Sequence, residues 1–291
     1  MLLAVPALRA IKAGGDQVVL AAQPAIGALL AALGVVDAHV SFDGLGLQAL
    51  FVEDGQPPRV AALERATRVV CWFGSRDPVF VRRFARASAG AIVAPAAGEA
   101  ATPVWQHLLA TVGSPPGDWC APASLPEPLL ADGRRALEAA GWDGVTPLVI
   151  AHPGAGGLAK RWPASGFARA LTGVLERRRA AIVISEGPAD HEAVVALRDA
   201  LGGDARVLRH PSLVELAAAL RFAAAYVGND SGVSHLAATV GAPALVLFDR
   251  TKLAWRPWSP TAAPRVVELS AVADGDVGAV GAALVERLTA R

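Results

Sequence analysis

Short apolar runs of strand length alternate along the chain with amphipathic stretches of helical period. Runs of this kind, separated by helices, predict βαβ units and parallel sheets covered on both faces. In the first half they predict strands at Val18–Ala22, His39–Phe42, Arg68–Phe73 and Ala91–Ala94. The pattern then starts afresh, with strands predicted at Leu148–Ala151, Ala181–Ser185, Arg206–Leu208, Ala224–Val227 and Ala244–Phe248, and helices near Ala164–Arg178, Ala189–Leu201 and Ser212–Phe222. The sequence therefore predicts an α/β protein with two doubly wound, Rossmann-like sheets.

A stretch rich in proline and glycine, from Ser114 to Pro128, separates the two halves. Such a composition favours an exposed connection over the interior of a helix or strand. A chain of 291 residues is long enough for two domains of ordinary size. We therefore expect one domain over residues 1–140 and a second over residues 141–291. Since open α/β sheets bind ligands at the carboxyl ends of their strands, the two are expected to face one cleft.

The segment Val18–Val36 is almost uncharged and about as long as a membrane span. Gln23-Pro24 falls inside it, and proline begins helices far better than it continues them. A buried strand followed by a helix is therefore the favoured interpretation. Met1–Pro6 is apolar but lacks the basic leader of a secretion signal, so we expect a cytoplasmic protein.

Composition narrows the classes of function. The chain is 18% charged with a net charge of +1, which provides no general field for nucleic acid, so an anionic ligand needs a local site. Cys71 and Cys120 lack the spacing of a zinc site, and no metal is expected. The Gly-x-Ser-x-Gly and His-Glu-x-x-His motifs of familiar hydrolases do not occur.

The first candidate site is the glycine-rich turn His152–Pro163 (HPGAGGLAKRWP), which lies between a predicted strand and a helix. Gly154 and Gly156 let backbone N–H groups approach an anion, the helix start adds a positive dipole, and Lys160 adds a mobile charge. These features indicate a phosphate-binding turn. The alternative is a plain glycine-rich connection with a solvated lysine, because the spacing matches neither a dinucleotide fingerprint nor a Walker loop.

The second candidate is the turn Gly228–His235 (GNDSGVSH), which follows a predicted strand and opens a helix. Asp230 or Ser231 can cap that helix, Gly232 permits close approach of a ligand to the backbone, and His235 lies one turn further on. This set suits sugar hydroxyls or a phosphate. The alternative is that Asp230 is only a cap and His235 only a hydrogen-bonded core histidine.

A third turn, Ser185–Glu192 (SEGPADHE), ends the strand between these two. Glu186, Asp190 or Glu192 can accept hydrogen bonds from ribose hydroxyls. Acidic residues are also common in the first turn of a helix simply because they favour its dipole, which is the alternative explanation.

Taken in order, HPGAGGLAKRWP, ISEGPADHE and YVGNDSGVSHLAATVGAPALVLF resemble the three landmarks of family 9 glycosyltransferases, best known as ADP-heptose heptosyltransferases. The first half agrees more loosely, through VPALRAIK and PVWQHLLATVG. The resemblance implies a GT-B fold and an inverting, metal-independent transfer of a sugar from a nucleotide donor. The donor would be an ADP-sugar such as ADP-heptose, bound mainly by the second domain, with no further cofactor. The acceptor would be a saccharide or a lipid-linked sugar, and a lipid-linked acceptor requires transient contact with a membrane.

The resemblance also assigns roles to matching positions. Lys160 and Asp230 are the residues expected to act in the reaction. Negative charge builds up on the diphosphate as it leaves, and Lys160 and the amino termini of helices can stabilise that charge. The positions implied to hold the donor are Gly154, Ala155, Gly156 and Lys160 for the diphosphate, Asp190 or Glu192 for the ribose, and Asp230, Ser231, Gly232 and His235 for the sugar and phosphate.

The chain departs from the family pattern in two places. Family members usually begin with a strand and a Gly-Asp turn before the segment matching VPALRAIK, and the aspartate is taken to deprotonate the acceptor. That strand is missing from the sequence as given, which implies either a trimmed start or a non-catalytic protein that binds nucleotide sugars. The second departure is Asp249-Arg250, where the family usually has Gly-Pro. The resemblance therefore does not settle the identity of the donor sugar. Arg250 and Lys252 are either phosphate or acceptor contacts or parts of a solvated basic loop.

A third possibility is another GT-B enzyme, such as a nucleotide-sugar epimerase. That activity needs a water-activating acid or base in the cleft. The sequence identifies no such residue, which ranks this interpretation below the other two.

Overall fold

The computed structural model describes residues 1–15, 17–53, 61–88, 90–99, 101–113, 117–203 and 205–290. The chain divides by its internal contacts into two compact units, Leu3–Trp119 and Cys120–Arg291. The predicted boundary at residue 140 stays a prediction. The helix before it, α6 (Glu127–Ala139), packs on α9 (Leu213–Leu220) and so belongs with the second unit.

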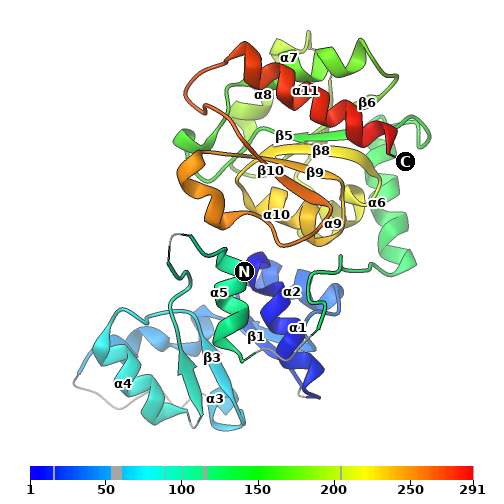
Figure 1. The fold of residues 1–291 in the computed structure, drawn as a ribbon. Coiled ribbons are helices and arrows are strands. Elements are labelled where there is room, and N and C mark those ends of the chain that lie inside the picture. The colour runs from blue at the N-terminus through cyan, green and yellow to red at the C-terminus, as the bar shows by residue number, and fades with distance from the viewer. Residues whose placement is uncertain are drawn as a thin grey trace. The chain divides into compact units, whose positions relative to one another are not determined.

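The first unit contains parallel strands covered by short helices (Figure 1). β1 (Val19–Ala22) pairs with β2 (Ala38–Ser41), and β3 (Val69–Cys71) pairs with β4 (Ala91–Val93). The strands agree with the predicted ones, but among the described residues they form two separate parallel pairs and not the one doubly wound sheet that was predicted. The remaining elements of the unit are η1 (Leu2–Ala4), α1 (Val5–Ala13), α2 (Pro24–Ala32), η2 (Asp43–Leu45), η3 (Leu47–Phe51), α3 (Ala61–Glu64), α4 (Pro78–Ala87) and α5 (Val104–Thr111).

The apolar segment Val18–Val36 is a strand followed by a helix, as predicted. β1 ends at Ala22 and α2 begins at Pro24, which occupies the first turn of the helix. A proline is tolerated there because its missing N–H has no partner within the helix. None of the helices in the described ranges is long and apolar enough to cross a bilayer.

The second unit is built on a six-stranded parallel sheet with the order β10-β9-β8-β5-β6-β7 (Figure 1). Its strands are β5 (Leu148–His152), β6 (Ala181–Glu186), β7 (Arg206–Arg209), β8 (Ala223–Asn229), β9 (Ala244–Phe248) and β10 (Ala262–Val266). Five of them were predicted. β10 was missed because its sequence contains Pro264 and is half-exposed, features that an edge strand accepts and a central strand does not.

Helices cover both faces of this sheet. α7 (Ala164–Leu175), α8 (His191–Ala200) and α11 (Asp274–Thr289) pack together on one face. Their apolar sides meet the sheet in one buried core that includes Phe167, Leu171 and Ile184. α6, α9 and α10 (Gly232–Thr239) form a second packed set, and α9 and α10 contact β8. Because β5, β6, β8 and β9 are buried along their whole length, a ligand can reach only the turns that follow them.

The packing of α6 on α9 generates a stability prediction. A Cβ added at Gly133 would lie 2.5 Å from the Ala218 carbonyl carbon and the Ala219 nitrogen, which are backbone atoms that cannot move aside. We expect Gly133→Ala to lower the free energy of unfolding by about 1–3 kcal/mol. The matched control is Gly278→Ala on α11, where a Cβ meets nothing within 4 Å and a gain of about 0.5–1 kcal/mol is expected. Urea denaturation of the full chain measures both, and equal midpoints would contradict the prediction.

Candidate functional site

The carboxyl ends of three adjacent strands bring the three predicted turns together. β5 is hydrogen-bonded to β8 on one side and to β6 on the other, and all three run parallel. The turns that follow His152, Glu186 and Asn229 therefore start at the same edge of the sheet. This edge of the second unit is the candidate site.

Asn229 ties the glycine-rich turn to the end of β8. The residue is completely buried; its Oδ1 accepts a hydrogen bond from Trp162 N (3.0 Å), and its Nδ2 donates to Pro153 O (2.8 Å). One side-chain amide thus holds both ends of the turn that carries Lys160. Sequence reasoning missed this role, although a polar residue directly after a buried apolar strand was the available signal.

Lys160, Asp230 and His235 form a charged cluster beside this clamp. Lys160 Nζ donates to Asp230 Oδ2 at 2.9 Å, and His235 Nε2 lies 3.4 Å from Asp230 Oδ1. The Asp230 side chain is only 9% exposed, whereas that of Lys160 is 47% exposed. Three residues predicted from two separate motifs are therefore in contact, with the ammonium group open to a ligand.

The start of α10 sets the position of this cluster. Ser231 is the cap, because its Oγ accepts from Ser234 N, while the Asp230 carboxylate makes no capping bond. The interpretation of Asp230 as only a cap is therefore wrong. Asp230 N donates to Leu247 O of β9 (3.0 Å), which fixes the backbone beneath the carboxylate. Gly232 begins the helix at the surface, and a Cβ there would meet nothing within 4 Å.

The electrostatics of the cluster favour an ionised Asp230. Burial alone would raise the pKa of Asp230, but hydrogen bonds from His235 and Lys160 and the charge of Lys160 outweigh it and hold this pKa below its usual range. His235 Nδ1 is buried and has no hydrogen-bond partner among the described residues. A buried polar atom without a partner is uncommon in folded proteins and is consistent with a site that a ligand completes.

Gly154 and Asp190 interlock on the other side of the turn. A Cβ at Gly154 would lie 2.0 Å from Asp190 Oδ1, so only glycine permits this carboxylate its place. Asp190 Oδ2 accepts from Gly187 N (3.0 Å) and lies 3.8 Å from Nε2 of the buried His152. Burial lowers the pKa of His152, although Asp190 opposes the shift, so the imidazole is neutral at pH 7.

The other residues of the glycine-rich turn differ in accessibility. Ala155 is buried with Gly154, whereas Gly156 is exposed and a Cβ there would meet nothing within 4 Å. The surface of the turn that is open to an anion therefore runs from Gly156 to Lys160. The part before it packs against Asp190.

The three acidic residues considered for ribose have different surroundings. Glu186 is fully buried and binds Arg209 and His191, with His191 Nδ1 2.8 Å from Oε1. The Glu192 side chain is 87% exposed at the first turn of α8 and reaches only to 4.0 Å from Arg161. Asp190 lies between Glu186 and Glu192 in the sequence, in the turn that follows β6. The ribose role of Asp190 or Glu192 stays a prediction.

Arg161 is a cation that sequence reasoning did not assign to the site. Its side chain is 18% exposed, its Nη2 lies 3.5 Å from Ala155 O, and its Nη1 lies 4.0 Å from Glu192. Its Nε is buried and has no partner in the described part of the chain. Its position next to Lys160 in a glycine-rich turn was the signal that could have identified it.

The Asp249 turn starts at the same edge, because β9 pairs with β8. Asp249 caps η5 (Arg250–Trp255): its Oδ1 accepts from Thr251 Oγ1 (2.6 Å) and Thr251 N (2.8 Å), and these bonds lower the pKa of Asp249. Arg250 and Lys252 are exposed on this turn. Their roles toward a phosphate or an acceptor stay predictions.

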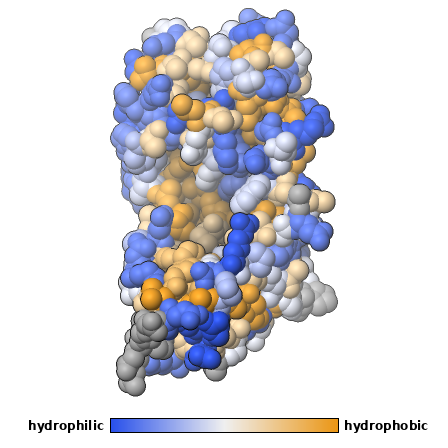
Figure 2. All heavy atoms as spheres, turned by 90° about the vertical axis from the view of Figure 1, so that its left-hand side faces the viewer, coloured by the Kyte–Doolittle hydropathy of each residue, from blue (hydrophilic) through white to orange (hydrophobic). Residues whose placement is uncertain are grey.

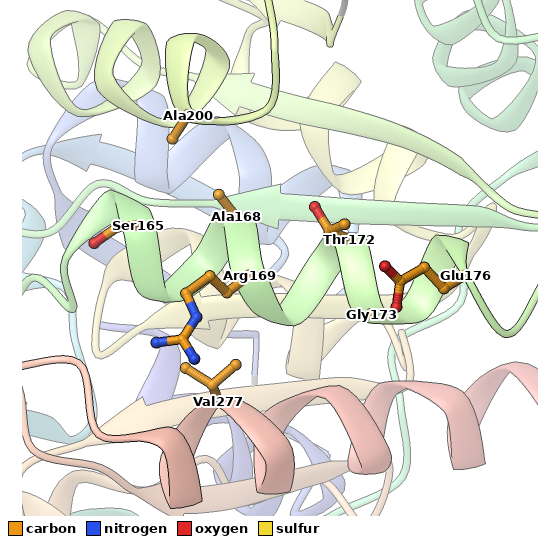
Figure 3. A pocket seen from close by; sticks show the side chains of 8 residues that line it. All are labelled: Ser165, Ala168, Arg169, Thr172, Gly173, Glu176, Ala200 and Val277. Atoms are coloured by element: carbon orange, nitrogen blue, oxygen red, sulfur yellow. The ribbon is translucent and has the colours of Figure 1, made fainter.

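One surface hollow of the second unit lies away from the strand ends. It encloses about 400 Å³ between α7, α8 and α11, and Figure 3 shows Arg169 of α7 facing Val277 of α11 across it. Arg169 forms an exposed ion pair with Asp274, which contributes little to stability. None of the predicted site residues lines this hollow, so we place the chemistry at the strand ends. In the described ranges, no three His, Cys, Asp or Glu side chains are grouped as metal ligands.

Comparisons with known proteins extend this picture. The model of glycosyltransferase family 9 (heptosyltransferase) matches residues 105–274, which include all three turns of the candidate site. No curated protein matches the sequence.

Solved structures match the whole chain at low identity. The Escherichia coli ADP-heptose LPS heptosyltransferase II is 18% identical with a TM-score of 0.73, covering 99% of this chain and 95% of that one. A family 9 glycosyl transferase from Veillonella parvula is 15% identical with a TM-score of 0.74, covering 100% and 94%. The E. coli heptosyltransferase WaaC, solved with ADP, is 14% identical with a TM-score of 0.66, covering 98% and 95%. At these identities the likeness shows the fold alone.

The Lys160–Asp230 pair generates a prediction about ionisation. Replacing Lys160 by methionine removes a hydrogen bond and a positive charge, so the pKa of Asp230 is expected to rise. The ionised carboxylate stabilises the fold above its unfolded pKa of about 4, and this contribution is lost as pH falls through the lower folded value. In Lys160→Met that contribution shrinks. Carbon NMR titration of the carboxyl group measures the shift, with Arg169→Met as the control. An unchanged pKa of Asp230 would show that the pair does not persist in solution.

Proposed function

This chain belongs to glycosyltransferase family 9, and from that membership we propose that it transfers a heptose or related sugar from an ADP-sugar to a saccharide or lipid-linked acceptor. We propose further that the transfer inverts the anomeric centre and needs no metal ion. The observation that carries the proposal is the contact of Lys160 with Asp230 at the ends of β5 and β8.

Several sequence predictions are confirmed. The resemblance to family 9 and the assignment as a glycosyltransferase agree with the family match. The GT-B fold agrees with the likeness to solved heptosyltransferases over nearly the whole chain. Donor, acceptor and stereochemistry belong to the proposal.

The proposed donor site lies entirely in the second unit. Lys160 has three ammonium protons, so it can keep its bond to Asp230 and still donate to a phosphate oxygen. The exposed backbone of Gly156 and Gly157 and the guanidinium of Arg161 supply further positive potential beside it. Transfer of the sugar leaves a nucleoside diphosphate with added negative charge, which these groups would stabilise as it develops.

Asp230 and His235 would contact the sugar side of the donor. Asp230 is ionised and accepts hydrogen bonds, and His235 Nδ1 is a buried atom in need of a partner. Sugar hydroxyls satisfy both requirements, since each hydroxyl can donate and accept. Asp190 lies against Gly154 of the glycine-rich turn, where ribose hydroxyls would follow the diphosphate.

Calorimetric binding of ADP, UDP and GDP tests the donor site. We expect a preference for ADP, and Lys160→Ala should weaken ADP binding by roughly 10-fold to 100-fold, the contribution of a charge-assisted hydrogen bond. Asp230→Ala should spare ADP and weaken an ADP-sugar, because only the sugar would contact Asp230. The control is Arg178→Ala, an exposed arginine beyond the end of α7. A folded protein that binds no nucleotide would overturn the proposal.

Sugar transfer in the presence of EDTA tests the proposal that the reaction needs no metal ion. We expect activity to persist, since the fixed positive charge of Lys160 and the helix starts would serve the leaving diphosphate. NMR of the product should show inversion at the anomeric carbon. Activity that disappears with EDTA and returns with Mg²⁺ would contradict metal independence. Nucleotide binding without any transfer would favour a non-catalytic protein that binds nucleotide sugars.

A further inference from the structure

Glu186 is a buried acid to which the proposed donor site gives no role. It is the last residue of β6 and directly precedes the turn that carries Asp190. A buried carboxylate is costly unless polar partners surround it, so its presence calls for an explanation. Because the Glu186 side chain is 0% exposed, it does not contact a ligand directly, and any effect on a ligand passes through its neighbours.

Two side chains from different elements hold the Glu186 carboxylate. His191 Nδ1 lies 2.8 Å from Oε1, and Arg209 Nη1 donates to Oε2. Arg209 is also the partner of Glu186 in the β6–β7 ladder, and His210 N donates to Glu186 O at 2.8 Å. His210 lies at φ +46°, in the left-handed region that residues other than glycine seldom adopt. Glu186 therefore joins the start of α8 to the end of β7.

The contact between Glu186 and His191 closes the turn that carries Asp190. Only residues 187–190 lie between the two side chains. Within the turn, Asp190 N donates to Gly187 O at 3.1 Å, and Asp190 Oδ2 accepts from Gly187 N at 3.0 Å. His191 is the first residue of α8, so its position fixes where the helix begins after Asp190. The turn is thus held by hydrogen bonds inside it and by a side-chain contact across its ends.

Asp190 has little room to move within this turn. Its carboxylate lies against Gly154 and 3.8 Å from His152 Nε2, and its side chain is 13% exposed. A hydrogen bond to a ribose hydroxyl weakens steeply with distance and angle, so a shift of the turn would impair it. The carboxyl ends of the sheet, where this turn lies, face the viewer in the upper half of Figure 2, and hydrophilic side chains are interspersed with hydrophobic ones there.

We propose that Glu186 is a positioning residue for ribose recognition. Its carboxylate holds the turn through His191 and Arg209, so that Asp190 keeps the place from which it accepts hydrogen bonds from the ribose of a nucleoside diphosphate. The inference rests on the proposed function, because it needs the nucleotide at this edge of the sheet. It also selects Asp190 over Glu192, whose side chain is 87% exposed and lies beyond the closed turn.

Calorimetry with ADP and with dideoxy-ADP, which lacks both ribose hydroxyls, separates ribose recognition from the rest of the site. The wild-type chain is expected to bind ADP roughly 10-fold more tightly, as hydrogen bonds to a carboxylate would provide. Glu186→Met fills a similar volume but removes both side-chain contacts. It should reduce the preference for ADP by roughly fivefold and leave the affinity for dideoxy-ADP unchanged. A merely structural role would weaken both nucleotides alike.

Two further variants keep the test decisive. His191→Ala breaks the same contact at a side chain that is 72% exposed, so folding is not at risk, and it should lower the preference as Glu186→Met does. Glu192→Met is the matched control, because it removes a carboxylate from the same helix start and should leave the preference unchanged. An unchanged preference in His191→Ala, an equal loss of both nucleotides, or a preference that only Glu192→Met removes would overturn the proposal.

The wild-type chain itself distinguishes this inference from the proposed function. Equal affinity for ADP and dideoxy-ADP would overturn ribose recognition by Asp190, and the donor site would still stand if Lys160→Ala weakened both nucleotides. A folded chain that binds neither nucleotide would overturn the proposed function and this inference with it.

Discussion

The parallel pairing of β5 with β6 and β8 is the constraint on which the candidate site depends. It makes three chain segments, separated by dozens of residues, begin their turns at one edge. The strands are fully buried, so apolar packing fixes the positions of their ends. Asn229 then converts this common edge into a defined geometry, because one buried amide holds both ends of the glycine-rich turn.

Charge at this edge is arranged in compensating pairs. Lys160 faces Asp230, Arg209 faces Glu186, and Arg161 faces Glu192 at a greater distance. A buried carboxylate without a partner would be costly, and Asp230 and Glu186 each have a cation beside them. Asp190 instead accepts a hydrogen bond from Gly187 N. The cations that are more exposed than their partners, Lys160 above all, are the ones that a ligand can reach without unburying a carboxylate.

Much of this arrangement could be predicted from the sequence. Apolar runs located nine of the ten strands found in the described part of the chain, and the turns after them located Lys160, Asp230 and Asp190, because ligands bind at strand ends in parallel sheets. Other features depend on pairings that no local pattern encodes. The Asn229 clamp joins residues 67 and 76 positions apart, and the ion pair of Asp230 with Lys160 joins two turns 70 positions apart. β10 was not predicted because this edge strand contains Pro264 and lacks the continuous apolar run of the neighbouring strands.

The interlock of Gly154 with Asp190 has a consequence for how such a chain can change. The carboxylate fills the space that any side chain at position 154 would need. The two positions are therefore thermodynamically coupled: their substitutions cannot be additive, and a larger residue at 154 becomes tolerable only after position 190 has been shortened. As related sequences diverge at this turn, Asp190 must therefore be replaced first, and only then can Gly154 be replaced by a larger residue.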